Sequence, residues 1–156
     1  MDATTKHRLL VVDDDASVLL TYQLLLQEQG YEVNAAISSK KAKEELRRSN
    51  FDVVLCDLSL EQDRTGFEVF EFARQMYPAI PCVLLTGYAN KEATDRARSY
   101  FTGYPPSSPS IGILRDGKLV YMMQRSDIET REAAEIAANL RAAFEKFCGK
   151  ALSESR

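Results

Sequence analysis

The chain has 156 residues, a formal net charge of -3 at pH 7 and 45% hydrophobic residues, which is typical of one globular domain. The slight acidity disfavours a nucleic-acid binder, because such a protein needs a basic face to neutralise phosphates. The longest apolar runs are far shorter than the ~20 residues of a membrane-spanning helix, and Met1 to Arg8 is too polar for a signal peptide. We therefore expect a cytoplasmic protein that binds neither nucleic acid nor membranes.

The first part of the chain alternates short apolar runs with segments of helical periodicity. The apolar runs, rich in leucine and β-branched residues, predict strands over 8–12, 31–36, 52–56 and 81–85. The segments between and after them predict helices over 16–29, 39–48, about 65–77 and from about Asn90 onward. This alternation is typical of a parallel sheet with crossover helices.

The pattern changes after residue 101. Pro, Ser and Gly predict a loop over 103–110, and Asp116-Gly117 between two apolar runs predicts an antiparallel hairpin. A final helix is expected over about 130–148, followed by a tail at 149–156. The sequence thus predicts an α/β protein of three layers, α/β/α, with a parallel sheet, an antiparallel C-terminal hairpin and a closing helix.

Acidic residues directly follow two predicted strands: Asp13, Asp14 and Asp15 follow the first, and Asp57 follows the third. Ligands bind beyond the carboxyl ends of parallel strands, so Asp13, Asp14 and Asp57 are expected to meet there. Converging carboxylates repel each other, and their oxygens suit Mg²⁺. Thr86 closes the fourth strand at the same edge, where its hydroxyl can donate to a phosphoryl oxygen. The simpler alternative is that these aspartates only cap a helix and a turn.

These segments resemble the receiver domain of two-component response regulators. The matching segments lie within about residues 6–88 and are LLVVDDD at 9–15, DVVLCDLSL at 52–60, Gly66-Phe67-Glu68 and LLTGY at 84–88. The resemblance implies a flavodoxin-like fold and phosphorelay signalling, with a histidine kinase or a small phosphodonor as partner. It also implies a role for each site residue: Asp57 as phosphoacceptor, Thr86 as switch hydroxyl, and Asp13, Asp14, Asp57 and the backbone carbonyl of Ser59 as ligands of Mg²⁺.

The sequence departs from that family at two places. Glu61 stands where receivers carry a proline, and the family's Lys-Pro after the fifth strand is absent. That lysine pairs with the acceptor carboxylate, and the nearest replacements, Arg115 and Lys118, belong to the predicted hairpin turn. We therefore expect impaired signalling output.

From about residue 89 to Cys148 the chain resembles the C-terminal half of a bacilliredoxin, a thioredoxin-like protein. The resemblance is most specific at YPPSSPS, residues 104–110, and implies a cis peptide bond at Pro109. The Cys-Gly-Cys that the family needs for redox chemistry is absent, and Cys148 has lost its partners. A thiol-disulfide oxidoreductase is therefore the least favoured function.

Together, the two resemblances indicate a chimera in which a receiver-like part, 8–88, and a thioredoxin-like part, 89–148, form a single α/β domain over 1–148. The first hairpin strand would take the place of the receiver's parallel fifth strand, which gives the strand order 2-1-3-4-5-6. The leading hypothesis is a phosphoacceptor domain that binds Mg²⁺. The alternative is an engineered chimeric scaffold without physiological activity. The sequence indicates no oligomeric state.

Overall fold

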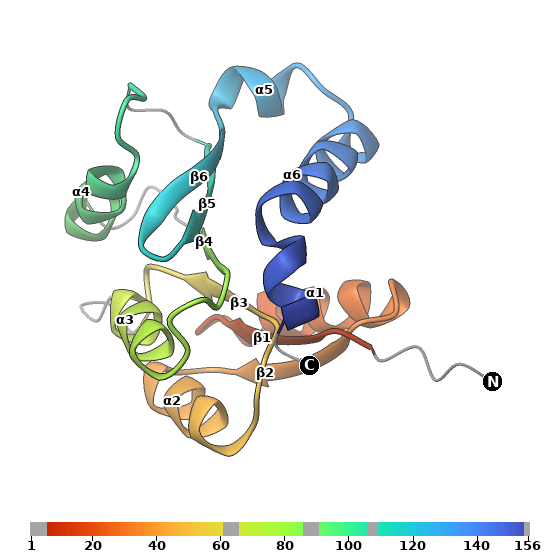
Figure 1. Cartoon of the computed structure of the whole chain (residues 1–156), viewed down its shortest axis with the longest axis vertical. Coiled ribbons are helices and arrows are strands. Elements are labelled where there is room, and N and C mark those ends of the chain that lie inside the picture. The colour runs from red at the N-terminus through yellow and green to blue at the C-terminus, as the bar shows by residue number, and fades with distance from the viewer. Residues whose placement is uncertain (1–5, 61–65, 86–90, 106–108, 155–156) are drawn as a thin grey trace.

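The computed structural model describes residues 6–60, 66–85, 91–105 and 109–154, with the backbone alone at 91–94 and 148–154 (Figure 1). The elements in chain order are β1 (Arg8–Val12), α1 (Ala16–Glu28), β2 (Glu32–Ala36), α2 (Ser39–Arg48), β3 (Val53–Asp57), α3 (Phe67–Met76), β4 (Cys82–Leu85), α4 (Lys91–Tyr100), β5 (Ile111–Arg115), β6 (Lys118–Met123), α5 (Arg125–Glu129) and α6 (Ala133–Glu154). The predicted strands and the first three helices are confirmed to within one or two residues wherever their ends are described. Among the described residues, no helix has the length and apolar character needed to cross a bilayer.

The strands form one sheet in the order β2-β1-β3-β4-β5-β6, which confirms the predicted order and the α/β fold class. Neighbouring strands are parallel from β2 to β4, whereas β5 is antiparallel to β4 and β6 is antiparallel to β5. The first hairpin strand thus takes the predicted place beside β4, and it runs antiparallel to β4 where a receiver's fifth strand would be parallel. Gly112 at the start of β5 lies opposite Leu84 at the end of β4. Before β5 begins, the chain has therefore returned to the end of the sheet at which β4 stops.

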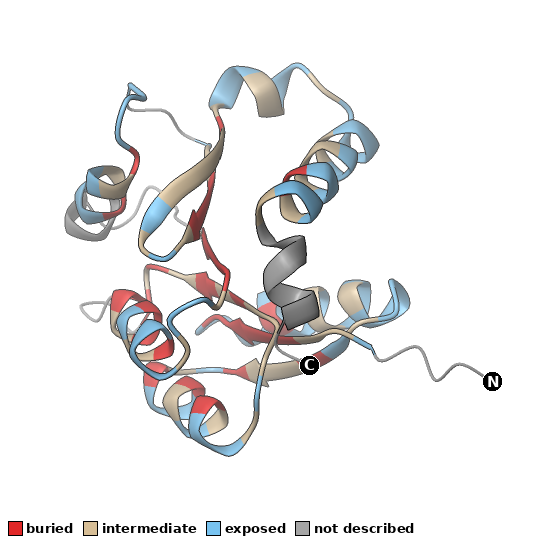
Figure 2. Ribbon diagram, viewed as in Figure 1, coloured by how far each residue is buried: buried red, intermediate tan, exposed pale blue. Residues whose placement is uncertain are grey.

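Helices cover both faces of the sheet, with α2, α3 and α4 on one side and α1 and α6 on the other (Figure 1). Side chains of a strand alternate between faces, so Leu10 and Val12 enter the larger core, while Val11 packs beneath α1 with Leu19. Ile113 of β5 packs against Ala143 of α6. Buried residues concentrate along the strands and the inner helix faces (Figure 2).

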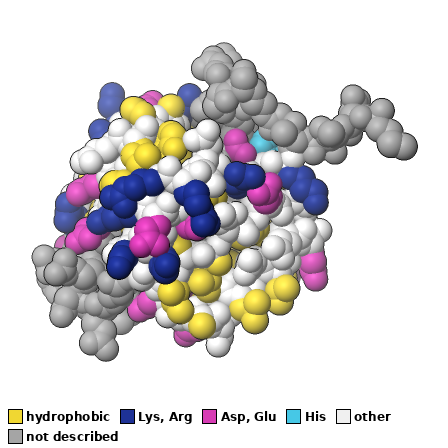
Figure 3. Space-filling view, turned by 90° about the horizontal axis from the view of Figure 1, so that it is seen from below, with side chains coloured by type: hydrophobic (Ala, Val, Ile, Leu, Met, Phe, Trp, Pro, Cys, Tyr) yellow, Lys and Arg dark blue, Asp and Glu magenta, His cyan; other side chains and the backbone are white. Residues whose placement is uncertain are grey.

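The exposed face of α2 carries many charged side chains. Seen from below, where α2 lies, lysines and arginines are interspersed with acidic groups (Figure 3). Lys41 pairs with Glu44 at 3.1 Å, and Arg48 pairs with Glu45. Arg47 lies 4.7 Å from the centre of the Phe72 ring. The positive charge of this face is thus partly balanced by its own acidic residues.

Aromatic packing attaches α4 to α3. The Tyr100 ring lies 5.9 Å from that of Phe67 and 5.7 Å from that of Phe70. Arg96 and Glu71 form an ion pair beside them. The next residue, Phe101, lies over Gly112 of β5, where an added Cβ would come within 2.5 Å of the ring. The segment after β4 is therefore packed onto the receiver-like part through aromatic rings.

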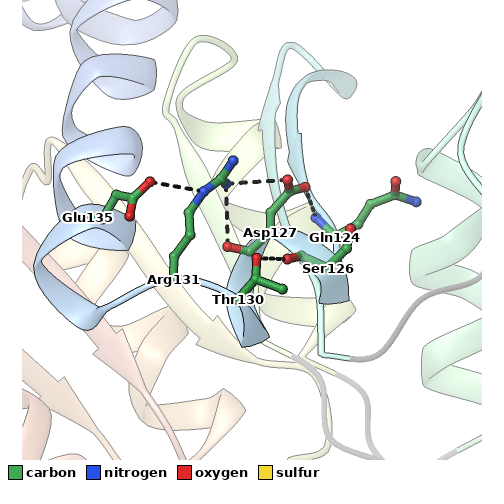
Figure 4. A network of polar contacts seen from close by, with 6 residues as sticks. All are labelled: Gln124, Ser126, Asp127, Thr130, Arg131 and Glu135. Atoms are coloured by element: carbon green, nitrogen blue, oxygen red, sulfur yellow. Dashed lines mark hydrogen bonds and ion pairs between the residues drawn. The ribbon is translucent and has the colours of Figure 1, made fainter.

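The C-terminal segment differs from the single helix expected over 130–148. It forms a short α5 and a separate α6, because a capping box between Gln124 and Asp127 starts a helix earlier (Figure 4). Arg131, between the two helices, pairs with Asp127 at 3.3 Å and with Glu135 at 3.2 Å. The expected tail is also partly helical, since α6 continues to Glu154; one interior glycine, Gly149, costs a helix only about 1 kcal/mol.

Candidate functional site

Three carboxylates converge at the edge of the sheet where β1 and β3 end. Val12 pairs with Cys56 in parallel register, so the residues that follow these strands leave the sheet side by side. One carboxylate oxygen from each of Asp13, Asp14 and Asp57 lies within 4.8 Å of the other two. The structure thus brings together the acidic residues that the strand ends predicted.

Backbone N–H groups orient two of these carboxylates. The Asp15 N–H donates to Asp13 Oδ1 at 2.8 Å, and the Ser59 N–H donates to Asp57 Oδ1 at 3.0 Å. The N-cap of α1 is Asp15, whose side chain accepts from two N–H groups of the first turn. Since Asp15 caps the helix by itself, capping does not explain the positions of Asp13 and Asp14.

Burial and mutual repulsion act on the acidic group. The pKa of Asp13 is raised above 3.8, first by burial and then by the charges of Asp57, Asp14 and Asp15, against the Asp15 N–H, which lowers it. The pKa of Asp57 is also raised, first by burial and then by Asp14, against two backbone N–H bonds. The nearby Tyr22 has a raised pKa through burial and through the charges of Asp13 and Asp57. A bound cation would relieve this repulsion.

Arg115 and Lys118, the hairpin cations, lie at the opposite end of the strands from the three carboxylates. Leu114 pairs with Cys82 at the start of β4, so Arg115 and Lys118 are remote from Asp57. Arg115 instead donates to the carbonyl oxygen of Phe147 in α6 at 2.5 Å. No Lys or Arg in the described segments is among the causes that shift the pKa of Asp57. Neither residue therefore replaces the missing lysine.

Gly66 is a site residue whose role the sequence did not reveal. A Cβ added there would lie 2.1 Å from the Asp57 carbonyl oxygen and 2.8 Å from Cys56 Sγ. The Gly66 N–H also donates to the Leu58 carbonyl oxygen at 2.9 Å. Its φ of -55° is open to any residue, so only this close approach requires glycine. The predicted site residue Thr86 lies outside the described residues, as does Glu61.

The cysteines with described side chains are unsuited to redox chemistry. Cys56 and Cys82 are both buried in the larger core. Burial raises the pKa of Cys56 well above 9.0 and that of Cys82 to about 12. Because the thiolate is the reactive form, both thiols are inert at neutral pH. The side chain of Cys148 lies outside the described part of the chain.

Replacing Asp14 with Asn should stabilise the metal-free protein. The substitution removes a charge that repels Asp13 and Asp57, and it leaves the helix cap at Asp15 intact. We expect a gain of about 0.5 kcal/mol in the free energy of unfolding, measured by urea titration in EDTA. Glu28→Gln, at the other end of α1, is the control. Equal stability of Asp14→Asn and the wild type would show that the charges do not interact.

Gly66→Ala should displace the backbone of Asp57 and cost about 2 kcal/mol of stability. The same substitution at Gly112 is the matched control, because its Cβ would meet the Phe101 ring and not the backbone of Asp57. Both variants should melt at a lower temperature. If Mg²⁺ binds the three carboxylates and raises the melting temperature, that rise should be lost in Gly66→Ala and kept in Gly112→Ala. An unchanged response of Gly66→Ala to Mg²⁺ would show that Gly66 does not help to position the Asp57 carboxylate.

Two family models match the chain, each over more than half of its length. The response regulator receiver domain matches residues 9–100, and the disulphide isomerase family matches residues 61–148. Residues 61–100, which contain α3, β4 and α4, belong to both matches.

Curated proteins similar to the C-terminal half of the chain include bacilliredoxins. A bacilliredoxin of Koribacter versatilis is 63% identical over 71 residues, which are 44% of this chain and 49% of that protein. A bacilliredoxin of Geobacillus kaustophilus is 49% identical over 74 residues, 46% of this chain and 51% of that protein. The chain thus spans about half the length of the curated relatives it matches.

Solved structures similar to the chain include receiver domains. A CheY-like receiver domain protein of Methanospirillum hungatei gives a TM-score of 0.55 at 29% identity, over 61% of this chain and 75% of that one. The HemR receiver domain of Leptospira biflexa gives 0.53 at 31% identity, over 63% of this chain and 77% of that one. The chain therefore belongs to the response regulator receiver domain family through residues 9–100 and to the disulphide isomerase family through residues 61–148.

Proposed function

We propose that the chain is a phosphoacceptor domain in which Asp57 accepts a phosphoryl group in the presence of Mg²⁺. The observation that carries this proposal is the convergence of three carboxylates, two of them oriented by backbone N–H groups, at the carboxyl ends of β1 and β3. A receiver domain family match over these strands supports it.

The donor set fits Mg²⁺. Asp13, Asp14 and Asp57 offer hard oxygen ligands, and the pKa of Asp13 and of Asp57 is raised first by burial and then by the neighbouring carboxylates. We assign the metal to these three carboxylates and to the backbone carbonyl of Ser59. When bound, Mg²⁺ would screen the charge of the incoming phosphoryl group and align it.

In the proposed reaction, an oxygen of the Asp57 carboxylate attacks the phosphorus of a phosphodonor. With acetyl phosphate, the bond from Asp57 to phosphorus forms as the bond from phosphorus to the acetyl oxygen breaks, and acetate leaves with the electron pair. With a histidine kinase, the phosphorus–nitrogen bond of a phosphohistidine breaks instead. Ser59 N–H holds the carboxylate in a fixed orientation, and Thr86 would donate to the phosphoryl group.

A second candidate is a scaffold of receiver and thioredoxin-like fragments that binds metal without accepting a phosphoryl group, of the kind an engineered chimera would give. The direction of β5 favours it, because this strand carries its cations to the edge of the sheet away from Asp57. The same strand direction, together with the closing helix α6, would alter the surface through which receivers signal. Both candidate functions therefore predict impaired signalling output.

The decisive measurement is the intact mass after incubation with acetyl phosphate and Mg²⁺. We expect a gain of one phosphoryl group, absent from Asp57→Asn and from samples in EDTA. Glu71→Gln, in an exposed ion pair on α3, is a control that should react like the wild type. A folded wild type that gains no mass would instead support the scaffold.

The response to Mg²⁺ should weaken as the pH falls. The folded-state pKa of Asp13 and of Asp57 lies above 3.8, so the folded protein binds more protons than the unfolded chain between 3.8 and those raised values. Metal-free stability therefore rises as the pH falls through this window, while protons compete with the metal. Melting curves at pH 7 and pH 5, with and without Mg²⁺, should show the larger metal-induced rise at pH 7. An equal rise at both would place the metal elsewhere.

A further inference from the structure

The hydroxyl of Ser59 is buried and has no hydrogen-bond partner. Ser59 lies two residues after Asp57, and its own N–H donates to Asp57 Oδ1 at 3.0 Å. The same residue therefore orients the proposed phosphoacceptor through its backbone and carries the unpaired hydroxyl on its side chain. Its hydroxyl can change direction by rotation about the single Cα–Cβ bond.

A buried hydroxyl without a partner destabilises a fold, and such groups are rare. Within the described residues, the other buried side-chain nitrogen or oxygen without a hydrogen bond is Arg115 Nε, which lies 4.0 Å from an Asp116 carboxylate oxygen. Arg115 is at the far edge of the sheet, so Ser59 provides the unused donor beside the acidic site.

A phosphoryl group on Asp57 would bring oxygens that need donors. The hairpin cations cannot supply them, because antiparallel pairing of β5 places Arg115 and Lys118 at the opposite edge. Donors other than the hairpin cations must therefore bind these oxygens. A serine hydroxyl can donate one hydrogen bond to an anionic oxygen.

We propose that the Ser59 hydroxyl is a phosphoryl-binding group that donates to an oxygen of the phosphorylated Asp57. The inference rests on the proposed function, since it needs a phosphoryl group at Asp57. It assigns the side chain of Ser59 a role separate from that of its backbone carbonyl, which would bind the metal. The unpaired hydroxyl then lowers stability without ligand and contributes hydrogen bonding with ligand.

The test compares wild type, Ser59→Ala and Ser59→Thr by melting temperature in EDTA, in Mg²⁺, and in Mg²⁺ with beryllofluoride as the phosphoryl probe. Ser59→Ala should melt higher than the wild type in EDTA and respond normally to Mg²⁺ alone. Its apparent affinity for beryllofluoride should fall about tenfold, the effect of one hydrogen bond to a charged group. Ser59→Thr, which keeps the hydroxyl, should retain the beryllofluoride affinity.

Ser49→Ala is the matched control, because Ser49 is also half-buried but lies near the start of β3, at the opposite edge of the sheet. It should leave the beryllofluoride response unchanged. An unaltered affinity in Ser59→Ala, or a lower melting temperature in EDTA, would overturn the role of Ser59. A wild type without any response to Mg²⁺ or beryllofluoride would instead overturn the proposed function, so the two failures are distinguishable.

Discussion

The antiparallel pairing of β4 with β5 determines how the two parts of the chain share one sheet. Leu84 opposite Gly112 fixes where the loop before β5 must end, and Cys82 opposite Leu114 fixes where the hairpin turn lies. From there Arg115 reaches the carbonyl oxygen of Phe147, which holds α6 against the sheet. Because of this pairing, the three carboxylates lie at one end of the strands and Arg115 and Lys118 of the hairpin turn lie at the other end.

The segment that both families match is also where the two parts pack together. The Tyr100 ring contacts Phe67 and Phe70 of α3, and Phe101 lies over Gly112 of β5. At the other end of the hairpin, a Cβ on Gly117 would lie 2.5 Å from the Arg74 guanidinium, so the turn packs directly onto the end of α3. Leu114 of the hairpin belongs to the same core cluster as Leu10 and Val54 of the receiver-like part. The two parts therefore share a continuous core.

Hydropathy periodicity was sufficient to predict most elements and the meeting of the carboxylates, because both depend on local pattern and on the geometry of parallel strands. The direction of β5 was not predictable, since the same apolar run fits either pairing and the choice depends on the path between α4 and Ile111. The division between α5 and α6 required the capping box at Gln124, which is not among the preferred N-cap residues. The roles of Gly66 and Ser59 depend on distances below 3 Å and on burial, which no spacing of residues encodes.

The hairpin also leaves β6 at one edge of the sheet, hydrogen-bonded to a neighbour on one side only. Edge strands offer unpaired backbone groups to other chains, and natural proteins discourage such contacts with charges, prolines or bulges. β6 reads KLVYMM, so Lys118 is the single charge along it, whereas at the opposite edge Glu32 of β2 pairs with Arg8. The register shift between Ile113 and Leu114 leaves Val120 of β6 without a partner in β5, so the outer strand carries a bulge near its start. Lys118 and this bulge both lie in the first half of β6, so strand addition in concentrated protein would begin at the regular, uncharged stretch 121–123.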